Sequence, residues 1–221
     1  MNNEALQRLL KAIIIIVLVI IISRFLPKKS DPEEIRRRDL AALARKLQLQ
    51  FNPNSDLKLA GRFSFRTWLR PGDAAYNVFH GYYMDSLVTI FDFTFMAGRY
   101  TYYWSAFVIE MRTNFQDLVI SHEKLEYRFA EALGDSHIVF ESNEFSRAFR
   151  VRCSDKKFAY DVCSPQMMEY LLANKDLTIE IRGAAIAILF EDWLRPEKVE
   201  SNLSRLVEIR KLLPHYLFTK S

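Results

Sequence analysis

Glycine and cysteine are scarce in this sequence, which has six glycines and two cysteines among 221 residues. Two cysteines exclude a disulfide-rich scaffold, and no GxGxxG or P-loop motif occurs that would bind phosphate. HExxH, CxxC and GxSxG motifs are also absent, and the four histidines lie far apart. The sequence therefore predicts no metal site, no cofactor and no catalytic set, and favours a protein that is not an enzyme.

A basic domain surface is lacking as well, although the formal net charge is +4. Residues 1–50 carry ten basic and five acidic side chains, so the remainder of the chain is nearly neutral. Nucleic-acid binding requires a basic patch on the folded domain, and this distribution removes that support. We therefore expect no nucleic-acid partner.

A long apolar run stands at the N-terminus, between residues 9 and 26. Eighteen residues form a helix of about 27 Å, close to the roughly 30 Å hydrocarbon core of a bilayer. A cleaved signal peptide is the first alternative, but residues 23–27 offer no small-x-small cleavage site. A buried core helix is the second, and the basic cluster that follows argues against it. We predict a short tail over 1–8 and an uncleaved membrane anchor formed by Leu9, Ala12, Ile13, Ile14, Ile15, Ile16, Val17, Leu18, Val19, Ile20, Ile21, Ile22 and Leu26.

The charges that flank this run predict its orientation. Arg8 and Lys11 precede the centre of the run, and six basic residues follow it. By the positive-inside rule, the C-terminal side faces the cytoplasm of a single-pass inner-membrane protein. The same six residues are candidate contacts for lipid headgroups, with a solvated helix face as the alternative; they are Arg24, Lys28, Lys29, Arg36, Arg37 and Arg38.

Beyond the anchor, the sequence predicts a juxtamembrane helix and then an α+β domain. Residues 27–51 form the basic linker, with a helix that starts at Asp31-Pro32, and the domain follows over residues 52–221. The first part of this domain is predicted to be an antiparallel meander. Strands that follow one another in groups, with helices between the groups, indicate an α+β domain with a mostly antiparallel sheet. The strands are expected at 76–84, 87–97, 100–112, 118–120, 137–141, 147–153, 158–162, 177–182 and 184–191. The helices are expected at 123–133, from Ser164-Pro165 to Asn174, and from Pro196 as an amphipathic C-terminal helix.

Two of these strands, 147–153 and 158–162, are expected to form a hairpin that contains both cysteines. A turn at Asp155-Lys156 places Cys153 opposite Phe158 and leaves Cys163 opposite Ala148. This register offers no easy disulfide and favours reduced thiols in the cytosol.

Asp92 is the one acidic residue for which the sequence suggests a functional role. Strand alternation places Val88, Ile90 and Asp92 on one face and Phe91 and Phe93 on the other. A carboxylate on a mostly apolar strand can act as an acid or base if its pKa is raised. The favoured interpretation is instead a structural acid that accepts hydrogen bonds from a neighbouring segment.

Aromatic residues are dense in the same meander, with twelve of the thirty in the chain between positions 76 and 107. They indicate either an apolar groove for a ligand or partner, or a central sheet packed on both faces. The core interpretation is favoured. Stacking on single-stranded nucleic acid would require interleaved basic residues, and Arg99 is the only one between Tyr76 and Phe107.

Several segments together resemble an uncharacterised family of bacterial membrane-anchored proteins with the pattern LAxxLGLxF, NVLxG, FDY and EFS. The segments are Asp39–Ala44 with Leu49–Phe51, then Ala75–Tyr83, Val88–Phe93 and Asn143–Arg147, and the similarity covers most of residues 39–213. Here Phe93 stands where that pattern has tyrosine, and the hairpin tip is reduced to Ala97-Gly98-Arg99. The resemblance implies membrane placement and domain extent, and it transfers no catalytic residue.

Three functions remain open from the sequence. The leading hypothesis is a cytoplasmic binding or scaffolding module that is anchored in the lipid bilayer and has a protein partner. One alternative is an enzyme for a membrane-derived or apolar substrate that uses Asp92 and the aromatic groove. The other is an accessory subunit of an envelope complex.

Overall fold

The computed structural model describes residues 7, 11–13, 15–18, 31–63, 65, 74–97, 99–122 and 137–218. The chain divides into two compact units, Met1–Ile35 and Arg36–Ser221. The division lies inside the first helix after the apolar run and not at residue 52, where the sequence predicts the domain to begin.

In the first unit, only parts of the predicted anchor are described. Residues 11–13 and 15–18 are helical, and the rest of the predicted span over 9–26 lies outside the described residues, as do Arg24, Lys28 and Lys29. Within the described part of the chain, the search for a helix of sufficient length and apolarity to cross a membrane finds none.

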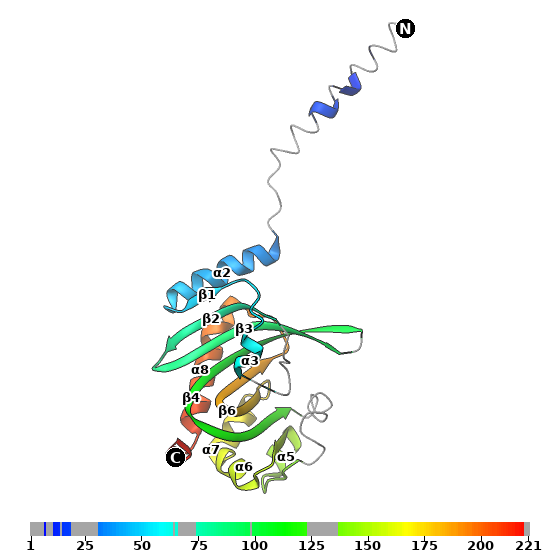
Figure 1. Cartoon of the computed structure of the whole chain (residues 1–221). Helices are drawn as coiled ribbons and strands as arrows, with labels where there is room; N and C mark the ends of the chain where they lie inside the picture. Colours follow the sequence, from blue (N-terminus) through cyan, green and yellow to red (C-terminus); the bar gives the residue numbers. More distant parts are fainter. Residues whose placement is uncertain are drawn as a thin grey trace. The chain divides into compact units, whose positions relative to one another are not determined.

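In the described part of the second unit, six strands form one antiparallel sheet in the order β1-β2-β3-β4-β5, with β6 paired to β4 (Figure 1). The predicted α+β class and mostly antiparallel sheet are confirmed. The meander is also confirmed, and its first turn has Met84 and Asp85 at φ 46° and 61°, as a type I′ hairpin turn requires. The strands are β1 (Gln50–Asn52), β2 (Ala75–Tyr83), β3 (Ser86–Ala97), β4 (Tyr100–His122), β5 (Phe149–Cys153) and β6 (Thr178–Phe190).

Strand β4 is much longer than predicted, because the expected strands 100–112 and 118–120 are one continuous strand. It pairs with β3 through Glu110 and with β5 from Leu118 onward, while β6 follows it along its other edge. The pairing with β6 shifts register on both sides of Phe115. These irregularities let one strand serve two parts of the sheet.

The predicted hairpin around Gly183 is wrong, since β6 runs without interruption from Thr178 to Phe190. Gly183 has φ 51° and lies opposite Phe115, where the register of the β4–β6 pair shifts. A glycine with positive φ suits a bulge as well as a turn. The sequence alone does not distinguish the two.

The second predicted hairpin is also wrong, because residues 156–162 form helix α6 (Lys156–Val162) rather than a strand. Asp155 is its N-cap, and its Oδ1 accepts a hydrogen bond of 3.1 Å from the backbone N–H of Phe158. Phe158, Ala159 and Val162 are buried on one side of the helix. Cys153 ends β5, Cys163 follows α6, and both are free thiols.

The other helices are α2 (Pro32–Lys46), α3 (Leu59–Phe63), α5 (Asn143–Ala148), α7 (Pro165–Ala173), α8 (Pro196–Leu212) and the 3₁₀ helix η2 (His215–Phe218). The helices predicted from Ser164-Pro165 and from Pro196 are confirmed as α7 and α8. The helix predicted at 123–133 lies outside the described residues. The strand expected at 137–141 is only an isolated bridge between Ile138 and Val151.

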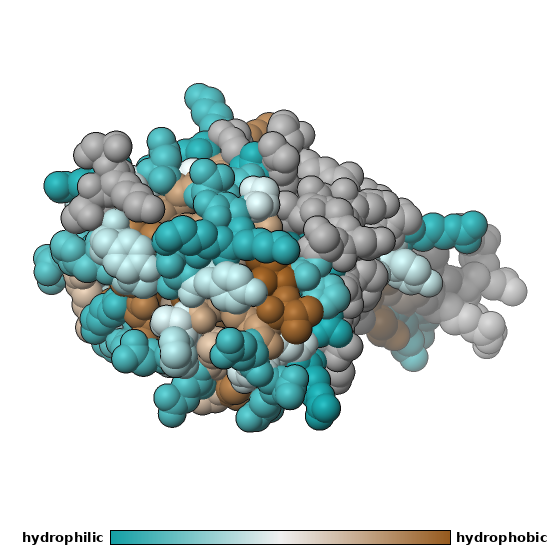
Figure 2. Space-filling model, turned by 90° about the horizontal axis from the view of Figure 1, so that it is seen from below, coloured by the Kyte–Doolittle hydropathy of each residue, from teal (hydrophilic) through white to brown (hydrophobic). Residues whose placement is uncertain are grey.

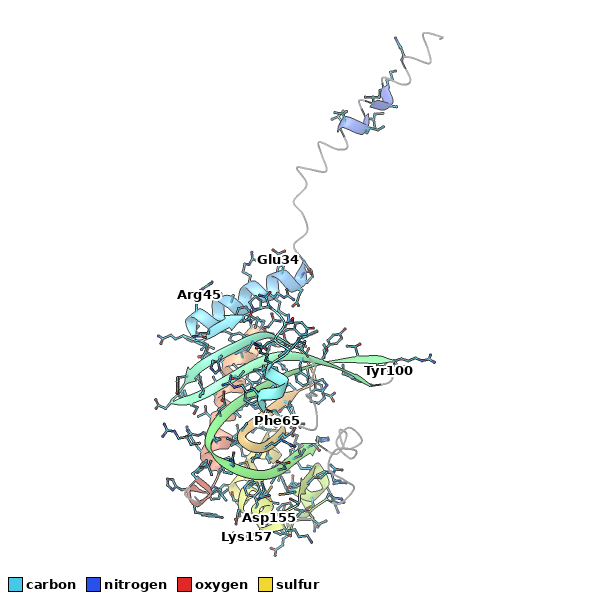
Figure 3. The ribbon with its side chains drawn as sticks, in the orientation of Figure 1. Glu34, Arg45, Phe65, Tyr100, Asp155 and Lys157 are labelled. Carbon is cyan, nitrogen blue, oxygen red and sulfur yellow. The ribbon has the colours of Figure 1, made fainter. Side chains whose placement is uncertain are left out.

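The sheet has a hydrophobic core on each face. The larger core joins Ile90, Phe107 and Ile188 of the sheet to side chains of α2, α5, α6, α7 and α8. The smaller core joins Phe91, Trp104 and neighbouring small residues to α3 and Phe65, which Figure 3 shows beside the sheet. Five of the twelve aromatic residues of the meander are buried in these cores and two more pack against them, which confirms the favoured interpretation for those side chains; they are Phe79, Phe91, Phe93, Trp104 and Phe107, with Tyr83 and Tyr102.

Helix α2 and strand β1 contribute to the core of the second unit, although the sequence predicts that the domain begins only at residue 52. Leu40, Ala44 and Leu49 are at most 6% exposed. Strand β1 pairs with β2 through Gln50, Phe51 and Asn52. The segment expected to be a linker is thus a structural part of the domain from Arg36 onward.

Candidate functional site

Asp92 lies in the middle of β3 and its side chain is fully buried. Val88 and Ile90 belong to the core on the helix side, whereas Phe91 and Phe93 belong to the core on the opposite side. The predicted alternation along this strand is therefore confirmed. It turns Asp92 toward the side of the sheet that α2 covers.

Three donors from three different segments hold the Asp92 carboxylate. Arg36 Nη1 of α2 donates to Oδ2 at 2.8 Å, and Asn77 Nδ2 of β2 donates to the same oxygen at 2.7 Å. The backbone N–H of Leu194 donates to Oδ1 at 2.6 Å. Arg36 Nη1 also donates to the carbonyl oxygen of Leu194 at 3.0 Å. Asp92 thus joins α2, two strands and the loop between β6 and α8.

Burial raises the pKa of the Asp92 carboxyl above its ordinary value, and this effect exceeds the lowering by Leu194, Arg36 and Asn77. A raised pKa alone is compatible with acid–base chemistry. Both carboxylate oxygens, however, already accept hydrogen bonds from protein donors. This arrangement favours the structural interpretation of Asp92, because a buried carboxylate needs such donors to be tolerated in a folded core.

An aromatic pair extends the network from Arg36 to the surface. The Arg36 guanidinium lies 5.1 Å from the centroid of the Trp193 ring, and this ring lies 4.6 Å from the ring of Tyr103 on β4. Among the cations predicted to contact lipid headgroups, Arg36 directs its side chain into the domain, while Arg37 and Arg38 are exposed. The sequence contains no local signal for the Arg36–Asp92 pairing, since the partners are far apart in the chain.

A pocket of about 610 Å³ adjoins this network and shares Trp193 and Leu194 with it. Its volume is within the range of roughly 300–1,000 Å³ that is typical of small-molecule sites. Ser105 and Phe107 of β4 and Phe190 of β6 line one side, and residues of α8 line the other. Ser105 is the pairing partner of Asp92 across the β3–β4 ladder, so the pocket lies next to the buried carboxylate.

Arg205 of α8 is held firmly in the wall of this pocket. It donates to both carboxylate oxygens of Asp176, at 2.9 and 2.5 Å, and to Asn202 Oδ1 at 3.3 Å. Its guanidinium also lies 5.5 Å from the centroid of the Phe190 ring. The hydrogen bond from Arg205 lowers the pKa of Asp176. Asp176 and Arg205 thus form a charged pair that shapes the pocket.

Two other hollows occur on the described surface of the second unit. One of about 800 Å³ includes Tyr82, Arg112 and Arg210, and one of about 400 Å³ includes the ion pairs Arg62–Glu110 and Arg182–Asp117. In the described residues, no three His, Cys, Asp or Glu side chains come together in a way that could hold a metal ion. Of these three pockets, the one lined by Trp193 and Leu194 adjoins the Arg36–Asp92 network.

Some aromatic side chains of the meander are exposed. Tyr100 and Tyr103 are 71% and 48% exposed, and they lie on the β3–β4 hairpin, which projects from the sheet with Tyr100 near its outer end (Figures 1 and 3). The face seen in Figure 2 is mostly hydrophilic, with only small hydrophobic areas between the charged residues. The projecting hairpin and the pocket are therefore better candidates for contact with a partner than that face.

No protein-family model and no curated protein sequence matches this chain. Among solved structures, the crystal structure of the mycobacterial trehalose monomycolate transport factor A, TtfA, is similar, with a TM-score of 0.58. The match covers 80% of this chain and 96% of that chain at 11% sequence identity. At this identity the likeness shows a shared fold. The resemblance to a family of bacterial membrane-anchored proteins remains a prediction from the sequence.

Proposed function

We propose that this protein is an accessory component of the bacterial cell envelope, anchored by its N-terminal apolar segment, with the α+β domain as a binding module on the cytoplasmic side. The likeness in fold to the mycobacterial trehalose monomycolate transport factor A supports an envelope role. The apolar residues between Leu9 and Leu26 and the basic residues after them support the anchor and its orientation.

One observation carries the proposal, namely the hydrogen bond between Arg36 and the buried Asp92. Arg36 follows the last apolar residue of the predicted anchor, Leu26, by ten positions in the sequence. Helix α2 is therefore bonded to the sheet through its fifth residue. Such a connection suits a module that has to act close to the bilayer.

A binding role is supported over catalysis by the chemistry of the site. The oxygens of Asp92 are engaged by Arg36, Asn77 and Leu194. The adjoining pocket is lined by aromatic rings and by ion pairs that are already formed, such as Arg205–Asp176. Aromatic surface with a few placed polar groups is typical of a ligand-binding pocket.

The experiment that tests the topology uses the full chain with a C-terminal tag, produced in bacterial cells. We expect the chain in the membrane fraction after an alkaline carbonate wash, and we expect the domain to stay intact when protease is added to spheroplasts. A periplasmic protein in the same sample serves as the control for protease access. Recovery in the soluble fraction, or digestion of the domain in intact spheroplasts, would contradict the proposal.

The accessory role is tested by crosslinking in living cells, followed by purification in detergent. We expect the full chain to be recovered with the same envelope protein in independent crosslinking experiments. Replacement of Tyr100 and Tyr103 by serine on the projecting hairpin should reduce this product, and replacement of the exposed Tyr160 on α6 should not. Recovery of monomers alone would argue against an accessory subunit.

A further inference from the structure

The pocket beside Asp92 contains buried polar side chains with unused hydrogen-bonding groups. Ser105 is 3% exposed and Asn202 is 8% exposed, and both line the pocket. Asn202 Oδ1 accepts from Arg205, whereas within the described residues Asn202 Nδ2 and the Ser105 hydroxyl have no hydrogen-bond partner. Neither donor atom is fully enclosed by the protein, so both are open to the pocket and can donate to a ligand that supplies acceptor oxygens.

Helix α8 presents a polar stripe to the same pocket. Lys198, Ser201, Asn202 and Arg205 all line it, and their spacing of three and four residues places them on one helix face. The N-terminus of α8 also has no side-chain cap, since its N-cap residue is Arg195 and this side chain makes no cap hydrogen bond. Pro196 has no N–H, the Lys198 N–H donates to the Arg195 carbonyl oxygen at 2.9 Å and Glu197 lies in the first turn, so the helix dipole alone favours an anion at this end.

The charge balance of the pocket agrees with an anionic group. Its lining has four cations, Lys175, Arg195, Lys198 and Arg205, against three acids, Asp176, Glu191 and Asp192, and Arg205 pairs with Asp176 while Arg195 pairs with Asp192. Lys175 and Lys198 are exposed and form no ion pair with the described residues. These two lysines therefore stand beside the unsatisfied donors of Ser105 and Asn202.

Aromatic rings provide the other half of the site. Phe190 and Trp193 are partly exposed and, together with the buried Phe107, they line the pocket. Such rings favour a hydrocarbon chain or another apolar group, because contact removes apolar surface from water. Arg36 and Tyr103 cover part of the Trp193 ring and Arg205 covers part of the Phe190 ring, and a free inorganic anion would leave the remaining exposed ring surface uncovered.

From these observations we infer that the pocket between β4, β6 and α8 binds an amphiphile with a phosphate or carboxylate headgroup and an acyl chain. Ser105, Asn202 and Lys198 bind the headgroup oxygens, and Phe190 and Trp193 cover the chain. This inference rests on the proposed binding role and names the ligand class of its site. A lipid is favoured over a free phosphate because the aromatic rings lie beside the polar donors.

The test uses the full chain in nanodiscs of phosphatidylcholine and a dodecyl phosphate that carries a diazirine at the end of its chain. After photolysis, the labelled peptides are mapped by mass spectrometry. We expect labelling within residues 186–206, and we expect the double variant Lys175→Glu/Lys198→Glu to reduce it by about tenfold or more, because charge reversal repels the phosphate. The control variant Lys156→Glu/Lys211→Glu reverses the same number of lysine charges outside the pocket, and it should leave the labelling unchanged.

Two further experiments distinguish a lipid from free phosphate and an anionic headgroup from a neutral one. An excess of inorganic phosphate should not displace the probe, and a dodecyl maltoside with the same diazirine should label the pocket far more weakly. Displacement by phosphate would overturn the lipid assignment, and equal labelling by the maltoside would overturn the anionic headgroup. Absence of pocket labelling in a chain that is inserted in the nanodisc would overturn the inference alone, whereas failure of membrane insertion would contradict the proposed function.

The variant Asn202→Ala provides a test that does not depend on charge. We expect it to reduce labelling several-fold while the circular dichroism spectrum and thermal midpoint stay close to those of the wild type. Unchanged labelling in this variant would contradict the role assigned to the buried amide.

Discussion

The guanidinium of Arg36 and the carboxylate of Asp92 form an ion pair of 2.8 Å in which the carboxylate is fully buried and the guanidinium is 17% exposed. The partners lie 56 positions apart in the sequence. Through Leu194, the same carboxylate also holds the loop that leads into α8 and forms one wall of the pocket. One acidic residue therefore connects the helix that follows the predicted anchor with the pocket proposed to bind an amphiphile.

Removal of this carboxylate should destabilise the domain. Asp92→Ala leaves Arg36, Asn77 Nδ2 and the Leu194 N–H without their acceptor in a buried place. We expect the free energy of unfolding to fall by about 3 kcal/mol, measured by urea denaturation of the full chain. Asp39→Ala on the exposed side of α2 is the matched control, and an equal effect of the two changes would contradict the structural role of Asp92.

The pH dependence of stability should report the titration of Asp92. Its pKa is raised above the ordinary value of 3.8 chiefly by burial, so folding penalises the charged carboxylate relative to the neutral form. The stability contributed by the neutral form is complete below the unfolded-state pKa and is lost as the pH rises through the folded-state pKa.

The wild type should be compared with Asp92→Asn, because asparagine does not titrate. We expect the difference in unfolding free energy, wild type minus variant, to decrease between about pH 4 and pH 7. Urea denaturation at several pH values measures this difference. A difference that stays constant or increases over this range would show that the folded-state pKa is not raised.

Arg36 and Arg38 should differ in their importance for stability although both belong to the same basic run. Arg36→Gln removes a hydrogen bond to Asp92, one to the Leu194 carbonyl and the contact with Trp193, and should cost about 1–3 kcal/mol. Arg38 is exposed, and Arg38→Gln should change stability by less than about 0.5 kcal/mol. Denaturation midpoints of the two variants provide the comparison, and equal midpoints would argue against the Arg36 network.

Asp155 should stabilise helix α6 as its N-cap. Asp155→Ala removes the hydrogen bond to the Phe158 N–H and should lower the unfolding free energy by about 1 kcal/mol. Ser154→Ala at the preceding exposed position should have little effect. If residues 158–162 were a strand that follows a turn at Asp155-Lys156, as the sequence suggests, Asp155→Ala would also have little effect.

We expect that glycine is needed at position 183 because of its backbone conformation, and not because a larger side chain would clash. At φ 51°, a Cβ would meet only Asn114 Oδ1 at 3.9 Å, so alanine would fit without a clash. We expect Gly183→Ala to cost about 1 kcal/mol because L-residues disfavour this φ. Gly183→Asn should cost less, since asparagine tolerates the left-handed region better. Equal costs for alanine and asparagine, measured by thermal denaturation, would contradict this explanation.

Much of the sheet and three of the helices, α2, α7 and α8, are predictable from the sequence. The meander follows from its dense aromatic and β-branched residues and from the turn at Met84-Asp85, and α7 and α8 follow from proline at their first positions. The wrong predictions concern residues whose local sequence is compatible with two different backbone structures. Gly183 suits a bulge or a turn, and the residues around Asp155 suit a helix cap or a hairpin turn.

The sequence by itself determined the charge asymmetry, the apolar N-terminal run, the α+β class and the orientation of Asp92 on its strand, because these depend on composition and on short-range periodicity. Only the tertiary structure decided that Arg36 pairs with Asp92 and that residues of β4, β6 and α8 enclose a pocket. It also decided that α2 belongs to the domain, since Leu40 and Ala44 are buried in its core. These features depend on contacts between residues far apart in the chain, which local patterns do not specify.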